Sequence, residues 1–430
     1  MVQGKPLRDT AVRIAGIAVI SFALASPAPA APFRLLAIGD SLTEEYRFEI
    51  PFSAPDSNPT NANVRNWVEL LIAKRPTAFS MGGYEPSAGN YLDYRNAGYE
   101  YNYGIPGFKA ERWNKLLYDP GFNPVDLNTR FELSGDLSAV NAVLVFIGGN
   151  DLSLTNNDAK HDKIRVFIGR IHDWVRANGP ANLPIIIATV PDIGATPQEK
   201  IPDPVTAAAA RQRVATLNAN IAAFGSRPNT YIARIDAITD RIFDQVPFHI
   251  NGTGFTYFNA VSGRENPPLH LFCKDGFHAG MAAQALIANE ILKAVNSFAT
   301  TPIPLFTNRE ILTIIGQNPD QPYLNWAGSA GGMLENPDGD ALPNLVEYTL
   351  GTSATVSNPP FTFLSEGAAI FTPSSEALRF ADLSVLQSAT LDNDWIPVPT
   401  SSIQPLPGGS MKILPTATKL FYKFQATPKP

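Results

Sequence analysis

Three residues of the sequence carry side chains that together could cleave an ester. Ser41 follows the apolar run 33–39 in a turn of small residues. Asp275 stands three residues before His278, a spacing that lets the carboxylate hold one ring nitrogen of the histidine while the other faces a hydroxyl. A serine hydroxyl is a poor nucleophile until a base takes its proton. We therefore predict that Ser41 is the nucleophile, His278 the base and Asp275 the residue that orients the base.

The attacked carbonyl also needs hydrogen-bond donors for the oxyanion that develops on it. The turn 102–107, Asn-Tyr-Gly-Ile-Pro-Gly, offers a backbone N–H at a glycine. Asn150 follows the apolar stretch 142–147 and offers a side-chain amide. We expect both donors to face Ser41.

The elements that must position these residues alternate along the chain. Apolar runs of strand length lie between helical stretches, which predicts a parallel sheet with helices on both faces. In such a sheet the chemistry lies at the carboxyl ends of the strands. We expect strands at 33–39, 142–147, 184–190 and 230–235, helices at 64–74, 111–117, 163–178, 205–224 and 280–298, and irregular chain in the rest of 107–137 and in 244–272.

Four stretches, in this order, resemble the sequence blocks of the SGNH (GDSL) hydrolase superfamily. They are Gly39-Asp40-Ser41-Leu42, Asn102-Tyr103-Gly104, Gly149-Asn150-Asp151 and Asp275-Gly276-Phe277-His278. The resemblance covers residues 33–298 and implies a flavodoxin-like, three-layer α/β/α domain that hydrolyses carboxylic esters, sometimes thioesters. It also implies an oxyanion hole formed by the N–H groups of Ser41 and Gly104 and the amide of Asn150. An inactive member of the superfamily is the alternative.

The first 30 residues are typical of a secretory signal peptide. Lys5, Arg8 and Arg13 precede the apolar run 14–25, and small residues follow as far as Ala31. The apolar run is too short for a stable transmembrane anchor. We therefore expect a protein secreted to the periplasm or the medium, with no transmembrane anchor.

Charge and cysteine content narrow the range of partners and cofactors. A net charge of −6 argues against nucleic acid or an anionic membrane as the main partner. The single cysteine, Cys273, excludes an internal disulfide, and we expect it to be a buried packing residue. His161 and His172 lie in a polar helical stretch and are expected to face solvent. Residues 31–299 contain no His, Cys and Asp cluster at metal-ligand spacing, so we expect no cofactor for catalysis.

The segment 44–101 is rich in aromatic residues, with Asn, Pro and Gly between them. A long loop beside a nucleophile often builds the substrate site. Aromatic faces mixed with amides suit sugar rings, whereas an alkyl slot would be lined by Leu, Ile and Val. The alternative is that the aromatics form the core of the loop itself. They are Tyr46, Phe48, Phe52, Trp67, Phe79, Tyr84, Tyr91, Tyr94, Tyr99 and Tyr101.

Beyond the hydrolase domain, which we place at 31–299, the pattern of the sequence changes. Residues 300–304 are predicted to be a linker. Short alternating runs separated by Pro, Ser and Gly then predict a small β-rich accessory domain over 305–430. We expect strands there at 360–364, 379–387 and 420–425, and a helix at 342–350.

One loop of this C-terminal region has the ligand spacing of an EF-hand-type calcium loop. Residues 336–347 also resemble the calcium loops of dockerin-like modules and Asp-rich segments near the ends of secreted bacterial proteins. Ala341 replaces the glycine of the sharp turn and Asn336 replaces the first aspartate. A helix start favoured by nearby acidic residues is the alternative. The expected oxygen ligands are Asn336, Asp338, Asp340, the carbonyl of Leu342, Asn344 and Glu347.

Together these features predict a secreted serine hydrolase with two domains. We expect it to act on small-molecule or carbohydrate esters, with short-acyl (acetyl) esters of carbohydrates preferred because of the aromatic segment and export. A lipase or lysophospholipase-like esterase is one alternative. An inactive hydrolase domain in a glycan-binding or surface-binding protein is another.

Overall fold

The computed structural model describes residues 31–46, 64–85, 92–95, 97–154, 157–257, 267–359, 361–364, 368–392, 394–415 and 420–430. The predicted signal peptide lies outside these ranges, as do Phe48, Phe52 and Tyr91 of the aromatic segment. Within these ranges, no helix is both long enough and apolar enough to cross a membrane.

A six-stranded parallel sheet forms the centre of the hydrolase region. Its order is β2-β1-β6-β7-β8, with β5 paired to the second half of β1 beside β2. When these five strands are numbered in chain order, their order across the sheet is 2-1-3-4-5, as in flavodoxin-like sheets. The strands are β1 (Phe33–Gly39), β2 (Phe79–Ser80), β5 (Asn102–Gly104), β6 (Ala142–Phe146), β7 (Ile185–Ala188) and β8 (Thr230–Ala233).

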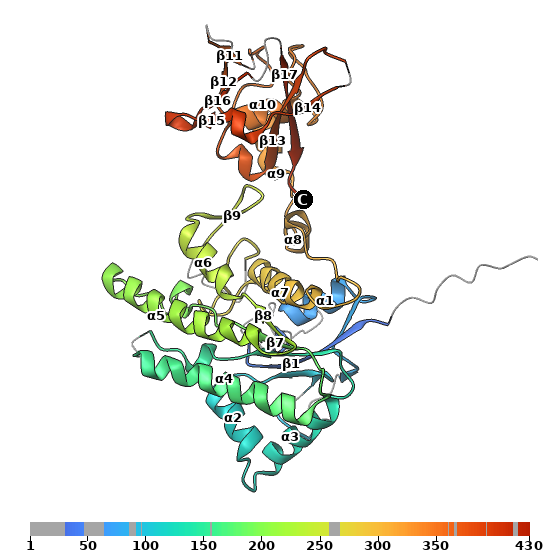
Figure 1. Ribbon diagram of the computed structural model, residues 1–430, viewed down its shortest axis with the longest axis vertical. Helices are drawn as coiled ribbons and strands as arrows, with labels where there is room; N and C mark the ends of the chain where they lie inside the picture. The colour runs from blue at the N-terminus through green and yellow to red at the C-terminus, as the bar shows by residue number, and fades with distance from the viewer. Residues whose placement is uncertain are drawn as a thin grey trace, which may run out of the picture. The chain divides into compact units, whose positions relative to one another are not determined.

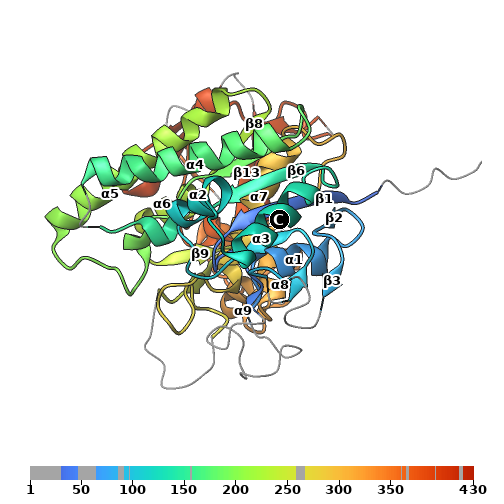
Figure 2. The same ribbon diagram turned by 90° about the horizontal axis from the view of Figure 1, so that it is seen from below.

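Helices cover both faces of this sheet, as Figures 1 and 2 show. Leu35 and Ala37 of β1 pack into one core with α1 and α7, while Leu36 and Ile38 pack into the other with α2, α4 and α5. This alternation confirms the predicted three-layer α/β/α fold. The helices are α1 (Trp67–Lys74), α2 (Ala110–Tyr118), α3 (Pro124–Asp136), α4 (Asp158–Asn178), α5 (Pro204–Ala222), α6 (Asp236–Asp244) and α7 (Met281–Asn296).

In the hydrolase region, helices α3 and α6, strands β2 and β5 and two short antiparallel strand pairs were not expected from the sequence. Helix α3 begins where Asn123 caps it and Pro124 fits the first turn, inside a stretch predicted to be irregular. Helix α6 likewise precedes a hairpin in the stretch predicted as irregular. The short antiparallel pairs are β3 (Tyr84–Glu85) with β4 (Gly98–Tyr99), and β9 (Phe248–Ile250) with β10 (Thr253–Phe255).

The C-terminal region contains two antiparallel sheets, which confirms its predicted β-rich character. Their orders are β11-β12-β16-β15 and β14-β13-β17. Phe361, Phe371, Val385 and Phe424 share a separate apolar core. The boundary at 300–304 remains a prediction. The elements are α8 (Asn308–Ile314), α9 (Gln321–Ala327), α10 (Asn344–Leu350), β11 (Thr362–Phe363), β12 (Ala369–Phe371), β13 (Ala381–Ser388), β14 (Ile396–Pro397), β15 (Ile403–Pro405), β16 (Met411–Ile413) and β17 (Phe421–Pro428).

The expectation that two histidines of α4 face solvent is wrong. His161 and His172 are both buried. The Nε2 atom of His161 lies 3.2 Å from the Ser153 carbonyl oxygen, and that of His172 lies 3.1 Å from the Thr230 hydroxyl. Both rings therefore serve packing within the α/β layers.

Candidate active site

The candidate nucleophile lies in a tight turn at the carboxyl end of β1. Gly39, the last residue of β1, pairs with the last residues of β5 and β6, so the loops after these strands meet at one edge of the sheet. The N–H groups of Thr43 and Glu44 donate to the Asp40 carbonyl at 2.9 and 3.0 Å. Position 39 requires glycine, because a Cβ there would lie 2.4 Å from the Thr43 hydroxyl oxygen. Ser41 thus starts a turn with one defined geometry.

Side chains from three other elements fix this turn. Asn66, the cap of α1, donates to the Thr43 and Glu44 carbonyls at 3.0 and 2.7 Å. The Asn102 amide donates to the Thr43 carbonyl at 2.9 Å, and the Trp113 indole N–H donates to the carbonyl of the strand end at 3.0 Å. These positioning roles were not predicted from the sequence.

The structure brings Ser41, His278 and Asp275 into a continuous hydrogen-bonded series. The Ser41 Oγ lies 2.8 Å from His278 Nε2, and His278 Nδ1 lies 2.6 Å from Asp275 Oδ2. The other carboxylate oxygen accepts the N–H groups of Phe277 and His278 at 3.0 and 3.1 Å. Gly276 has φ of +70°, which lets the loop close so that the Cys273 N–H donates to the His278 carbonyl.

These contacts keep the candidate orienting acid ionised. Burial by itself raises the pKa of Asp275, but the hydrogen bonds from the His278 ring and from two backbone N–H groups outweigh it and hold the pKa below its ordinary value. With the carboxylate ionised, Nδ1 carries the proton and donates it. Nε2 is then free to accept the Ser41 hydroxyl proton.

The glycine turn contains two glycines, of which Gly107 and not Gly104 lines the cleft at Ser41. Gly104 lies inside β5, pairs with Gly39, and donates its N–H to the Asn102 side chain at 3.2 Å. Gly107, with φ of +71°, instead lines the cleft that also contains Ser41 and His278. Among the described residues, the N–H groups of Gly107 and Ser41 have no hydrogen-bond partner. Because the strand ends at residue 104, the loop beyond it reaches the site.

The loop after β6 carries the predicted amide donor. Asn150 lines the same cleft, and one amide hydrogen is held by the Phe108 carbonyl at 2.9 Å. Asp151 accepts the N–H groups of Ala110 and Glu111 at 2.7 and 3.3 Å, which caps the start of α2 and fixes the loop. Among the described residues the second amide hydrogen of Asn150 has no hydrogen-bond partner, so a ligand in the cleft can accept it.

The profile of the GDSL-like lipases and acylhydrolases matches residues 35–291, more than half of the chain. The chain belongs to the GDSL-like lipase/acylhydrolase family. This GDSL hydrolase is therefore a carboxylic ester hydrolase that acts on small-molecule esters. It matches none of the curated proteins with which it was compared.

Solved structures similar to this GDSL hydrolase include three enzymes at low sequence identity. One is LAE5, an alpha/beta hydrolase from the metagenome of Lake Arreo, Spain, with 16% identity over 63% of this chain and 98% of that chain, at a TM-score of 0.35. Another is the acetyl xylan esterase AlAXEase, with 12% identity over 61% and 100% of the two chains, at 0.34. Phospholipase A1 from Streptomyces albidoflavus NA297 has 16% identity over 63% and 100%, also at 0.34.

Two hollows of different character meet at Ser41. One is a broad cleft of about 650 Å³ that contains His278 and Asn150 and has polar walls at Gln198 and Glu199. The other is a narrow cavity of about 60 Å³, which shares Ser41, Asn150 and Phe277 with the cleft. Its walls are mainly aliphatic and aromatic: Leu42, Ile193, Ile235, Ile238, Ile242, Phe272, Phe277, Ala279, Ala283 and Ile287.

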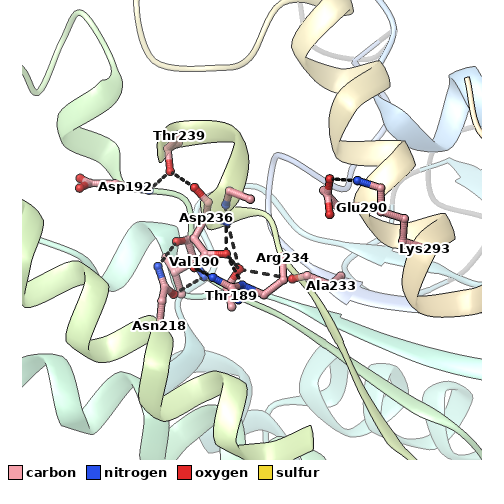
Figure 3. A network of polar contacts seen from close by, with 11 residues as sticks. Thr189, Val190, Asp192, Asn218, Ala233, Arg234, Asp236, Thr239, Glu290 and Lys293 are labelled. Carbon is pink, nitrogen blue, oxygen red and sulfur yellow. Dashed lines mark hydrogen bonds and ion pairs between the residues drawn. The ribbon is translucent and has the colours of Figure 1, made fainter. Parts of the chain in front are cut away.

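Figure 3 shows a network of polar contacts that includes Asp192 and Thr239, two residues that line the narrow cavity. The Thr189 hydroxyl donates to Asp236 at 2.8 Å and accepts its backbone N–H at 3.0 Å. The Asp192 N–H donates to the Thr239 hydroxyl at 3.2 Å. Asn218 of α5 exchanges two hydrogen bonds of 2.8 Å with the backbone of Val190. The loop after β7 is thereby tied to α5 and α6.

The described aromatic residues of 44–101 pack into the fold. Tyr46, Trp67 and Phe79 are fully or almost fully buried. Tyr84 and Tyr99 contact each other edge to face. Among the described residues of this segment, none of the aromatics lines either hollow at Ser41. For these residues the alternative of a loop core is the one that the structure supports.

Cys273 behaves as the sequence predicts. It is fully buried, and its thiol donates to the Ala279 carbonyl at 3.5 Å. Burial raises the pKa of the Cys273 thiol well above its ordinary value, so the reactive thiolate is not formed at neutral pH.

Asp40 gives this GDSL hydrolase a specific dependence of stability on pH. Burial raises the pKa of Asp40 to about 6. The folded protein therefore holds this proton more tightly than the unfolded chain, and stability falls as the pH rises from about 4 to about 6. Asp40→Asn keeps an acceptor for the Leu42 N–H, now 3.0 Å from Oδ1, and removes the titration. We expect the free energy of unfolding of the variant to gain about 2 to 2.5 kcal/mol on wild type between pH 4 and pH 7.

Urea unfolding of the two proteins at pH 4, 5.5 and 7 measures this difference. Asp392→Asn, the same change of side chain at an exposed residue, provides the control. A difference between Asp40→Asn and wild type that does not change with pH would contradict the role of Asp40.

Proposed function

We propose that this GDSL hydrolase cleaves a short-acyl ester of a polar alcohol, such as an acetylated carbohydrate, through an acyl-enzyme on Ser41. The observation that carries the proposal is the series of Ser41, His278 and Asp275 at the junction of a polar cleft and an apolar cavity. The proposed mechanism needs all three residues, and every proton transfer in it takes place within this series.

In the proposed mechanism, His278 takes the Ser41 proton as the hydroxyl oxygen attacks the ester carbonyl. Asp275 holds the imidazole in the required tautomer and stabilises the imidazolium that forms. The tetrahedral intermediate collapses when His278 returns the proton to the leaving alcohol. Water then attacks the acyl-enzyme by the same steps and releases the acid.

We assign the oxyanion to three donors: the N–H groups of Ser41 and Gly107 and the amide of Asn150. All three residues line the cleft that contains His278. This assignment replaces Gly104 with Gly107, because the Gly104 N–H is already bonded to Asn102 inside β5. Gly107 is the better candidate because β5 ends at Gly104 and the loop after it reaches the cleft.

The two hollows support a substrate whose alcohol lies in the broad cleft and whose acyl group lies in the narrow cavity. The broad cleft with Gln198 and Glu199 suits a hydrated, hydrogen-bonding alcohol such as a sugar. The narrow cavity suits an acyl chain, and about 60 Å³ gives room for about four to six groups of the size of a methylene or a water. This size supports an acyl group from acetyl to about hexanoyl.

A second candidate, a lipase-like esterase for longer acyl chains, is favoured by one further observation. A larger apolar cavity of about 370 Å³ lies next to the narrow one, and Asp192 and Ile242 line both. Phe243, Phe248 and Tyr257 are among its walls. A chain that passed Ile242 would find considerable apolar space.

We also propose that the protein is exported. The sequence of residues 1–31, with its basic start, apolar run and small residues, supports this proposal. An acetylated polysaccharide outside the cell is a substrate that fits it. The alternative of an inactive hydrolase fold is disfavoured by the complete hydrogen-bonded series at Ser41.

Acyl-chain preference tests the proposed use of the narrow cavity. On p-nitrophenyl esters, we expect kcat/KM of the wild type to rise from acetate to butyrate or hexanoate and to fall at decanoate. Ile242→Ala should shift the ratio of decanoate to acetate upward by about tenfold, because it removes a wall shared with the larger cavity. Ala283→Leu should lower the ratio of hexanoate to acetate by a similar factor, because it fills the cavity.

Each ratio is measured on one protein, so loss of folded enzyme cancels, and the two variants are predicted to change in opposite directions. Equal ratios in all three proteins would remove the cavity as the acyl site. A wild-type preference that continues to rise through dodecanoate would favour the lipase-like candidate.

A further inference from the structure

A cluster of three carboxylates lies in the C-terminal region, outside the hydrolase site. One oxygen from each of Asp338, Asp340 and Glu347 can be chosen so that all three lie within 4.8 Å of one another. Asp338 and Asp340 belong to the loop before α10, and Glu347 belongs to α10 itself. Like charges this close repel unless a proton or a cation lies between them.

Two carboxylate oxygens of the cluster lack any partner. Glu347 is 0% exposed, and its Oε2 has no hydrogen-bond partner among the described residues. Its Oε1 accepts a long bond of 3.5 Å from the Thr352 hydroxyl. Asp338 Oδ2 is also buried without a partner. Buried polar atoms in proteins are normally satisfied, so these two oxygens point to a missing ligand.

No positive side chain compensates the cluster. Within the described ranges, no Lys, Arg or His forms an ion pair with any of the three carboxylates. A bound cation would remove both the repulsion and the unpaired buried charge.

We propose that Asp338, Asp340 and Glu347 bind a calcium ion. Carboxylate oxygens are the ligands of hard cations, and the absence of His and Cys from this group disfavours zinc and other transition metals. Calcium accepts six to eight oxygens in flexible geometry, so waters and backbone carbonyls can complete a site that has three carboxylates.

The three carboxylates belong to the larger ligand set predicted from the spacing of the loop. Asn344 donates its amide N–H groups to the carbonyls of Ala330 and Gly332 at 2.9 and 3.0 Å, and so ties α10 to an earlier loop. Its Oδ1 is buried and has no hydrogen-bond partner among the described residues. The Asn336 amide donates to the Asp340 carbonyl. Ligand roles for Asn336, Asn344 and the Leu342 carbonyl stay predictions.

The site would join the loop to the packed core of the C-terminal region. Asp340 accepts the N–H groups of Leu342 and Asn358 at 2.6 and 2.9 Å, which holds it in place on the loop side. On the helix side, residues adjacent to Glu347 pack into two apolar cores. Calcium removal is therefore expected to destabilise this region rather than the hydrolase site.

Thermal melting and calorimetric titration of the full chain test the proposal. After treatment with a chelator, wild type should melt about 4 °C or more below its melting temperature in millimolar calcium chloride. Titration of calcium chloride into the chelated protein should show one binding event. Glu347→Gln and Asp338→Asn should lose the shift and weaken binding by more than about tenfold, whereas the exposed Asp392→Asn should keep both.

The chelated state separates a ligand from a structural role. Chelated Glu347→Gln should melt at or above chelated wild type, because the substitution removes an unpaired buried charge. Identical melts of wild type in calcium and in chelator, or a calcium shift that persists in both variants, would overturn the proposal. Ester hydrolysis by the chelated enzyme is a separate readout, so the outcome here does not depend on the proposed function.

Discussion

Replacement of Ser41 by alanine is expected to lower kcat on p-nitrophenyl butyrate by about 10⁴-fold to 10⁶-fold. The hydroxyl oxygen, 2.8 Å from His278 Nε2, forms the bond to the acyl group in the proposed mechanism, and no other described hydroxyl takes this place. Purified protein is assayed at pH 8 under saturating substrate, with the melting temperature measured alongside. The rate that remains should reflect only the oxyanion donors and substrate binding.

Two companion variants make this result specific. His278→Ala should cost a similar factor, and the double variant should be no slower than either single one, because the two groups act in one step. Ser226→Ala removes an exposed hydroxyl that donates to the Ala223 carbonyl at 2.8 Å, and should leave kcat unchanged. Comparable rates for Ser41→Ala and wild type would mean that Ser41 is not the nucleophile.

The central strands were predictable from the sequence because a strand that is buried on both faces consists almost entirely of apolar residues. β6 and β7 are buried at every residue, and such strands form continuous apolar runs. Helix α3 gave no such signal. Its Leu127 and Phe131 are 44% and 74% exposed, so its apolar residues do not form one buried stripe. The spacing of apolar residues predicts a helix only where one side of the helix is buried, so it does not predict a helix that lies largely in solvent.

The candidate site was predictable at the residues that carry functional side chains, and less so where the backbone acts. Ser41, His278, Asp275 and Asn150 are chemically distinctive at their spacing. The choice between two glycines of the turn is not, because it depends on the residue at which β5 stops pairing with β1. The available signal for Gly107 was the Pro106-Gly107 pair, which is typical of a turn.

The cavity beside Ser41 could not be predicted, because its walls come from separate stretches of the chain. Ile193 follows β7, Ile238 belongs to α6, Phe272 to the loop before α7, and Ile287 to α7 itself. The substrate was predicted from the aromatic segment instead, because the composition of one continuous stretch can be read directly from the sequence. In the structure, the described aromatic residues of this segment line neither hollow at Ser41.

Removal of the Asn150 amide should give the second large effect on catalysis. We expect Asn150→Ala to lower kcat by about 10²-fold to 10³-fold while KM changes little, because the amide binds the oxyanion far more strongly than the carbonyl that precedes it. The structural basis is the single amide hydrogen that the Phe108 carbonyl leaves available at the cleft. The Ser41 hydroxyl and His278 remain intact in this variant, so acylation should still occur slowly.

A matched control separates oxyanion binding from the loss of an amide-to-carbonyl hydrogen bond. Asn178 donates to the Trp174 carbonyl at 2.8 Å near the end of α4, and Asn178→Ala should keep the wild-type kcat. Asn150→Asp tests the charge: it keeps the size of the side chain but presents a carboxylate to the developing oxyanion, so it should be at least as slow as Asn150→Ala. A rise in KM with unchanged kcat for Asn150→Ala would assign the amide to ground-state binding and remove it from the oxyanion hole.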